Sequence, residues 1–95
     1  MSFVRVVRFS GVDPERIDSL KERIEQADGP PEGVPASGVQ LLHDEEQATA
    51  VVIQTFGSME DLKTGEEVLS AMDAGDTPGT RESVDRCELK VEMSP

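Results

Sequence analysis

The chain has 95 residues, a formal net charge of −11 and a single cysteine, and it contains neither tryptophan nor tyrosine. Its length predicts one domain over residues 1–95, with a small core that association with a second copy would supplement. The charge disfavours nucleic acid and anionic membranes as partners. Without a long apolar run, a secretory signal or a possible internal disulfide, the sequence predicts a soluble cytoplasmic protein.

The first predicted element is a strand over Phe3–Ser10. Apolar side chains occupy both faces of its pleat, interrupted by Arg5 and Arg8, and this is typical of a central strand. A helix should follow, because Asp13 can accept from free amide groups and Pro14 suits the first helical position. Its apolar stripe is Ile17, Leu20 and Ile24.

A connector over Gly29–Gly38, rich in glycine and proline, ends this helix. Two short apolar runs then flank a polar turn at Asp44–Gln47. The pattern predicts a hairpin of two strands, Val39–His43 and Ala48–Phe56.

A second helix is predicted after Ser58, which can cap it three residues before Asp61. Four side chains share its apolar face: Met59, Leu62, Leu69 and Met72. Gly65 falls on the same face and indicates a kink, a close approach to the sheet, or space for a ligand. Three methionines are interpreted as flexible side chains that pack in the apolar core: Met59, Met72 and Met93.

The last predicted strand runs over Val84–Met93, after a loop at Asp73–Arg81. Four apolar side chains alternate there with charged ones: Cys87, Leu89, Val91 and Met93. The alternation predicts an edge strand with one solvent-exposed face. It places Cys87 on the buried face, as an unreactive thiol.

The element order, βαββαβ, predicts a ferredoxin-like α+β fold, with an antiparallel sheet and two helices on one face. The first and third strands should lie in the middle, because they are apolar on both faces. One apolar sheet face would then remain uncovered by helices. We therefore expect a homodimer whose sheets pack face to face.

In length, element order and two-faced central strands, the chain resembles the dimeric α/β-barrel proteins, including antibiotic-biosynthesis-monooxygenase-like domains. The resemblance covers nearly the whole chain and implies the same fold and homodimer. It also implies a pocket between helices and sheet. Catalytic members of that superfamily often use tryptophan, tyrosine, asparagine or histidine there. This chain has only His43 of these four residue types.

Four residues are candidates for a site. His43 stands beside acidic residues as a weak catalytic candidate, although a surface histidine is the preferred interpretation. Arg5 lies mid-strand and needs a partner, either Gln54, Glu88 or an anionic ligand. Arg5, Arg8 and Gln54 are therefore the candidate ligand-binding residues, against the alternative of an ion pair within or between subunits.

The sequence predicts no metal site and no cofactor, since no phosphate loop is present and aromatic residues for stacking are few. Three functions stay open. The first is a homodimer that binds a small apolar or acidic metabolite. The second is a cofactor-independent, monooxygenase-like enzyme in which His43 or Arg5 assists. The third is a non-catalytic dimerisation or regulatory module.

Overall fold

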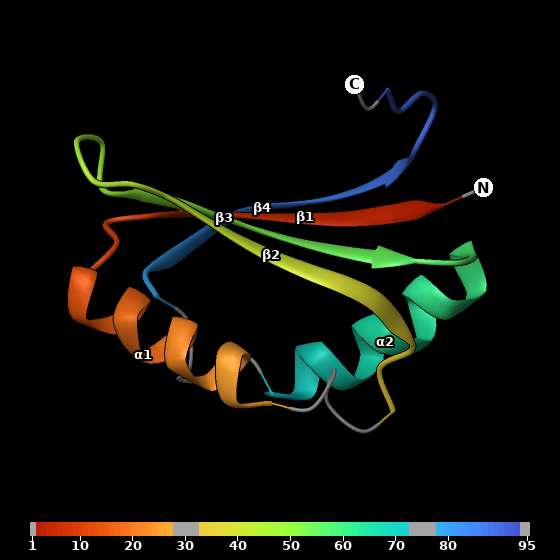
Figure 1. The fold of residues 1–95 in the computed structure, drawn as a ribbon, viewed down its shortest axis with the longest axis horizontal. Coiled ribbons are helices and arrows are strands. Elements are labelled where there is room, and N and C mark those ends of the chain that lie inside the picture. The colour runs from red at the N-terminus through yellow and green to blue at the C-terminus, as the bar shows by residue number, and fades with distance from the viewer. Residues whose placement is uncertain (1, 28–32, 73–77, 94–95) are drawn as a thin grey trace.

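The computed structural model describes residues 2–27, 33–72 and 78–93 (Figure 1). Helices and strands follow in the predicted order, which confirms the ferredoxin-like α+β fold. Their bounds are β1 Phe3–Ser10, α1 Pro14–Gln26, β2 Ala36–Asp44, β3 Thr49–Phe56, α2 Met59–Met72 and β4 Thr80–Glu88.

The four strands form one antiparallel sheet in the order β2-β3-β1-β4. β1 and β3 are therefore central, as their two-faced apolar pattern predicts. Both helices lie on the same side of the sheet, α1 below the end with the β2–β3 turn and α2 below the other end (Figure 1). The opposite side, which we call the uncovered face, carries no helix of the described residues.

Both helices begin where their capping residues indicate. The Asp13 carboxylate accepts from the Glu15 backbone N–H at 2.9 Å, and Ser58 Oγ accepts from the Asp61 N–H at 3.1 Å. These bonds satisfy amide groups that a helix start leaves free. Neither helix, over the residues described, is long and apolar enough to cross a membrane.

The β2–β3 hairpin turns through a short acidic loop. Asp44 accepts from the Gln47 backbone N–H at 3.2 Å, and Ala48 has a φ of 54°. A left-handed conformation is unusual for alanine. The Ala48 carbonyl accepts from the Val12 N–H at 2.9 Å, so the turn also fixes the segment between β1 and α1.

The side chains of β1 alternate between the two faces of the sheet. Arg5, Val7 and Phe9 are buried on the helix side. Val4, Val6 and Arg8 therefore point to the uncovered face. The same alternation in β3 places Val51 and Ile53 on the uncovered face, opposite Arg8 and Val6 in register.

The apolar core has two parts, one under each end of the sheet. The first contains Val7, Phe9, Val12, Ile17 and Ala50, and belongs to α1. The second, belonging to α2, is built on three buried residues: Val34, Phe56 and Leu62. Each helix therefore covers about half of the sheet, and the middle lies between the two clusters.

Gly65 marks a close approach of α2 to the sheet. A Cβ at this position would lie 2.8 Å from Cε1 of Phe56 and 3.2 Å from Cγ1 of Val34. Of the three interpretations of this glycine, close approach is the one that the packing supports. The helix needs glycine here because the Phe56 ring occupies the space of a side chain.

The last strand differs from the prediction. β4 spans Thr80–Glu88, so it starts and ends earlier than the predicted Val84–Met93. Cys87 is exposed, and its predicted burial is wrong for the single chain, because no layer covers its face. Met93 is 89% exposed rather than core filler, whereas Met59 packs against the second core cluster. The Met72 side chain lies outside the described residues.

We expect Gly65→Ala to destabilise the protein by about 1–3 kcal/mol, because overpacking against a fully buried ring exceeds the helix propensity gained. Urea unfolding measures this change. Gly38→Ala is the matched control, because an added Cβ there meets nothing within 4 Å. A stable Gly65→Ala variant would contradict the packing described for α2.

Candidate functional site

Arg5 is the one buried charged residue in the described part of the chain, with 3% of its surface exposed. It lies on the helix side of β1, between the two core clusters. Its Nη1 donates to Gln54 Oε1 at 3.0 Å, and its Nε donates to Glu66 Oε2 at 3.2 Å. Arg5 is thus held by one residue of β3 and one of α2.

A second arginine stands directly opposite the first. Arg86 of β4 pairs in register with Arg5, so two like charges are neighbours on adjacent strands. Such a pair is unfavourable unless a counter-charge joins it. Glu66 supplies that counter-charge, since its two oxygens accept from Arg86 Nε at 3.0 and 2.8 Å, and Oε1 accepts from Nη2 at 2.7 Å.

We call Arg5, Gln54, Glu66 and Arg86 the arginine cluster. Hydrogen bonds from Arg86 lower the pKa of Glu66 below its usual value, against the opposing effect of burial. The same hydrogen bonds raise the pKa of Arg86. Glu66 is therefore ionised at neutral pH, and since guanidinium groups keep their proton in proteins, two cations face one carboxylate. The cluster has an excess positive charge.

The cluster is open to solvent on one side. The Arg86 side chain is 47% exposed and that of Glu66 is 18% exposed, while Arg5 is 4% exposed. Arg86 lies on β4, an edge strand, so an anion arriving from solvent would meet it first. The exposed fraction of these side chains therefore falls from the β4 edge of the sheet towards its middle.

Several apolar side chains on the helix side of the sheet and on α1 are only partly covered. Val39, in register with Gln54, is 44% exposed, and Leu41 and Val52 are partly buried. On α1, Ile17 is the buried residue, whereas Leu20 and Ile24 are only half-buried. The middle of the sheet therefore combines a cationic group with apolar surface that the helices leave accessible.

The structure brings together two of the three predicted ligand-binding residues. Arg5 and Gln54 share a hydrogen bond, but Arg8 lies on the uncovered face with its side chain 58% exposed, 3.9 Å from Asp85. Glu88, the other suggested partner of Arg5, instead accepts from Lys90 at 3.0 Å. Arg5 thus forms its ion pair within the subunit.

His43 lies away from the arginine cluster. It faces the helix side of β2 and is in register with Ala50, which pairs with Phe9. Phe9 is four residues from Arg5 along β1, or about 13 Å at the rise of a strand. Among the described residues, the Nε2 atom of His43 is buried and has no hydrogen-bond partner, so this histidine is not a simple surface residue.

The sequence reasoning missed Glu66 and Arg86. Glu66 lies four residues after Leu62 and three residues before Leu69, so it shares the apolar face of α2. A charged residue on an apolar helix face indicates a buried partner. Arg86 lies on the helix side of β4, and its partner comes from a helix 20 residues earlier. Among the described residues, no group of three histidine, cysteine or acidic side chains is arranged to hold a metal ion.

Comparisons with known proteins identify the fold. No family model matches the chain, and no curated protein matches its sequence. Among solved structures, Rv0793 from Mycobacterium tuberculosis superposes with a TM-score of 0.65 at 12% identity, over 99% of this chain and 100% of that one. A mutant of MhuD, with two manganese protoporphyrin IX molecules bound per active site, superposes with a TM-score of 0.62 at 15% identity, over 98% and 99%.

These likenesses extend over whole chains. They confirm the fold that the resemblance to dimeric α/β-barrel proteins implies for a single subunit. At such low identity they do not carry an activity across.

We expect Glu66→Gln to destabilise the protein at pH 7 by about 1.5–3 kcal/mol, as for a hydrogen bond to a charged group. Because the folded-state pKa of Glu66 is lowered, its stabilisation is present above the unfolded pKa, about 4.3, and is lost as pH falls through the folded pKa. The difference between variant and parent should therefore shrink in acid.

Urea unfolding at a series of pH values between neutral and acid measures this difference. Glu67→Gln, at the exposed next position of α2, is the control and should change stability little. A gap between Glu66→Gln and the parent that stays constant across the series would contradict the ionic role of Glu66.

Proposed function

We propose that this protein binds a small organic acid with an apolar body at the arginine cluster, and that it does so as a homodimer. The observation that carries the proposal is the burial of Arg5 in the middle of the sheet, with a second guanidinium beside it. A carboxylate is the natural ligand of such a pair, because a guanidinium binds it through two parallel hydrogen bonds.

Fold stability alone gives little reason for this arrangement. Taking an arginine out of water is costly, and apolar residues of similar volume often stabilise a core as well or better. Two opposed arginines add repulsion that Glu66 must offset. A charge placed at such cost, in a chain of net charge −11, is better explained by binding an anion.

The surroundings support an acid with an apolar body. The half-exposed Val39 and the partly covered Leu20 and Ile24 offer apolar surface on the helix side of the sheet. Protoporphyrin IX, which the MhuD mutant holds as its manganese complex, is itself an apolar ring carrying carboxylates. A protein of the same fold thus accommodates a ligand of this general chemistry.

The homodimer is proposed from the uncovered face. Its apolar side chains form a continuous stripe across three strands, from β1 through β3 to β2: Val4, Val6, Val51, Ile53 and Leu42. Leu42 is 50% exposed and the other four side chains are partly exposed, and apolar surface gathered on one face in this way marks an interaction site. A second copy presents the matching surface, so two sheets would cover each other.

A second candidate function is a cofactor-independent, monooxygenase-like enzyme. The buried, unpartnered Nε2 of His43 favours it, because a group of this kind can hold or accept a proton from a substrate. His43→Ala would then abolish turnover while leaving acid binding at the arginine cluster intact.

We expect monocarboxylates such as octanoate and benzoate to raise the melting temperature, and their neutral amides to have no effect. Arg86→Leu should abolish the response, since it removes the exposed guanidinium that an acid meets first. Differential scanning fluorimetry measures the shift, and calorimetric titration gives the affinity.

Arg8→Leu is the control, because it removes an arginine from the uncovered face and should leave acid binding unchanged. Native mass spectrometry of gently purified protein provides a second readout, with a small adduct expected. No response to any acid, together with a mass free of adducts, would contradict the binding proposal and favour the dimerisation module.

For the dimer, we expect light scattering at micromolar concentration to give the mass of two chains. Cys87, in register with Val4 on the uncovered face, should react slowly with a maleimide in the dimer and faster after dilution. Ile53→Lys should dissociate the dimer, because it places an unpaired charge in the apolar stripe. A monomer with a rapidly reacting thiol would contradict the face-to-face assembly.

A further inference from the structure

The arginine cluster belongs to a row of residues that crosses the whole sheet. Four residues are in register on β2, β3, β1 and β4, with their side chains on the helix side: Val39, Gln54, Arg5 and Arg86. The rows on either side are apolar on the first three of these strands, with Leu41, Val52 and Val7 in one and Ala36, Phe56 and Phe3 in the other. Among the described residues, Glu66 is the one carboxylate that accepts from either arginine of this row.

Glu66 binds Arg86 as a free carboxylate would. Its two oxygens accept from Nε and Nη2 of Arg86, which lie on one edge of the guanidinium, at 2.7–3.0 Å. This is the bidentate arrangement in which arginine usually binds a carboxylate. Because Arg86 is also the arginine of the cluster that solvent reaches first, the Glu66 side chain occupies the place that the carboxylate of a bound acid would take.

Arg5 has N–H groups to which Glu66 could turn. Its Nε donates to Glu66 Oε2 at 3.2 Å, the longest hydrogen bond of the cluster, and its Nη1 donates to Gln54. The described residues provide no partner for Nη2, which lies on the same edge of the guanidinium as the Nε–H group. A turn of the Glu66 side chain that brings Oε1 to this Nη2 would therefore make the contact with Arg5 bidentate as well.

The balance of charge favours such a turn when an acid binds. If Glu66 stayed on Arg86, the two carboxylates would share one guanidinium, and like charges at this distance repel each other more strongly beside apolar rows than in open water. If Glu66 turned to Arg5, each guanidinium would have a carboxylate of its own. The excess positive charge of the cluster would then be neutralised exactly once.

We propose that Glu66 stands in for the carboxylate of the ligand, and that the acid binds by exchange: its carboxylate takes the Nε–Nη2 edge of Arg86 while Glu66 turns to Arg5. This inference rests on the proposed acid binding and specifies it. Arg86 contacts the ligand, and Arg5 receives the displaced Glu66. Glu66 therefore lowers the affinity of the site, and a second carboxylate on the ligand would find no arginine left to bind it, so the site selects monocarboxylates.

The test compares the affinity for benzoate of the parent with that of two variants at position 66, by calorimetric titration at pH 7. Glu66→Gln removes the charge, whereas Glu66→Asp keeps the charge and shortens the reach towards Arg86 by one methylene. Both variants should bind benzoate about threefold to fivefold more tightly, because the exchange then no longer breaks an ion pair of this exposure. Glu67→Gln, which removes a charge at the exposed next position, should change the affinity less than about twofold.

A second measurement needs only the parent protein. In nitrogen-15 spectra at pH 6, saturating benzoate should shift the Nε–H signal of Arg5, because its partner Glu66 rearranges, although Arg5 itself is buried. The Nε–H signal of Arg8, on the uncovered face, should stay unchanged, and benzamide should shift neither signal.

The outcomes separate the exchange from acid binding itself. Benzoate that binds the parent but binds Glu66→Asp no more tightly overturns the exchange, even if Glu66→Gln gains affinity, since that gain would come from charge alone. An Arg5 signal that does not move at saturation overturns it too. In both cases acid binding still stands. Failure of benzoate to bind the parent and both variants at position 66 overturns the proposed acid binding, and the exchange with it.

Discussion

Two arginines placed opposite each other on adjacent strands set the main constraint on this fold. Arg5 and Arg86 are in register across β1 and β4, and their repulsion has to be offset inside the domain. Glu66 does this from α2, with hydrogen bonds of 2.7–3.0 Å to Arg86 and 3.2 Å to Arg5. α2 is therefore joined to the sheet by an ionic contact as well as by apolar packing.

The close packing of α2 serves the same contact. Gly65 lets the helix approach until the Phe56 ring fills the space of a missing side chain, and Glu66 is the next residue. A larger residue at position 65 would move the neighbouring carboxylate away from both arginines. The two apolar clusters then lie on either side of a charged centre, which differs from the single continuous core usual for a domain of this size.

Much of the fold could be predicted from the sequence, because it depends on local patterns. The cap at Asp13, the hairpin turn at Asp44 and the two-faced pattern of β1 each follow from neighbouring residues. The end of β4 could not be predicted from Cys87–Met93, because alternation continues beyond Glu88 whereas the pairing strand does not. Strand length depends on the partner, and the partner is distant in sequence.

The site was predicted only in part for a similar reason. A mid-strand arginine indicates that a partner exists, and Gln54 was among those expected. The partner that matters most, Glu66, lies 61 residues away on a helix. Its place in the apolar stripe of α2 was the available indication. The separation of Arg8 from Arg5 follows from parity, since residues three apart in a strand point to opposite faces.

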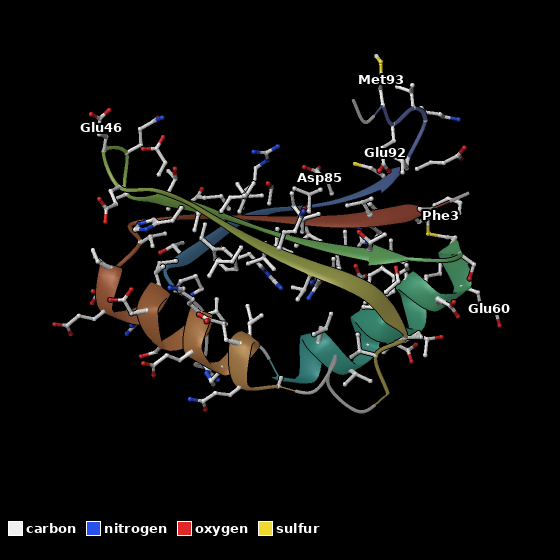
Figure 2. All side chains as sticks on the ribbon, viewed as in Figure 1. Phe3, Glu46, Glu60, Asp85, Glu92 and Met93 are labelled. Atoms are coloured by element: carbon white, nitrogen blue, oxygen red, sulfur yellow. The ribbon has the colours of Figure 1, made fainter. Side chains whose placement is uncertain are left out.

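The distribution of charge is compatible with the proposed association of two copies through the uncovered face. The net charge of −11 would oppose dimerisation if it were spread evenly. Acidic residues instead stand at the hairpin tip with Glu46 and at the start of α2 with Glu60 and Asp61. Glu46 and Glu60 are labelled in Figure 2 and lie well away from the middle of the uncovered face. On that face the exposed Asp85 has Arg8 beside it at 3.9 Å. Over the middle of the face that two copies would share, this acid–base pair stands among apolar side chains, so long-range repulsion weakens their association without opposing the contact itself.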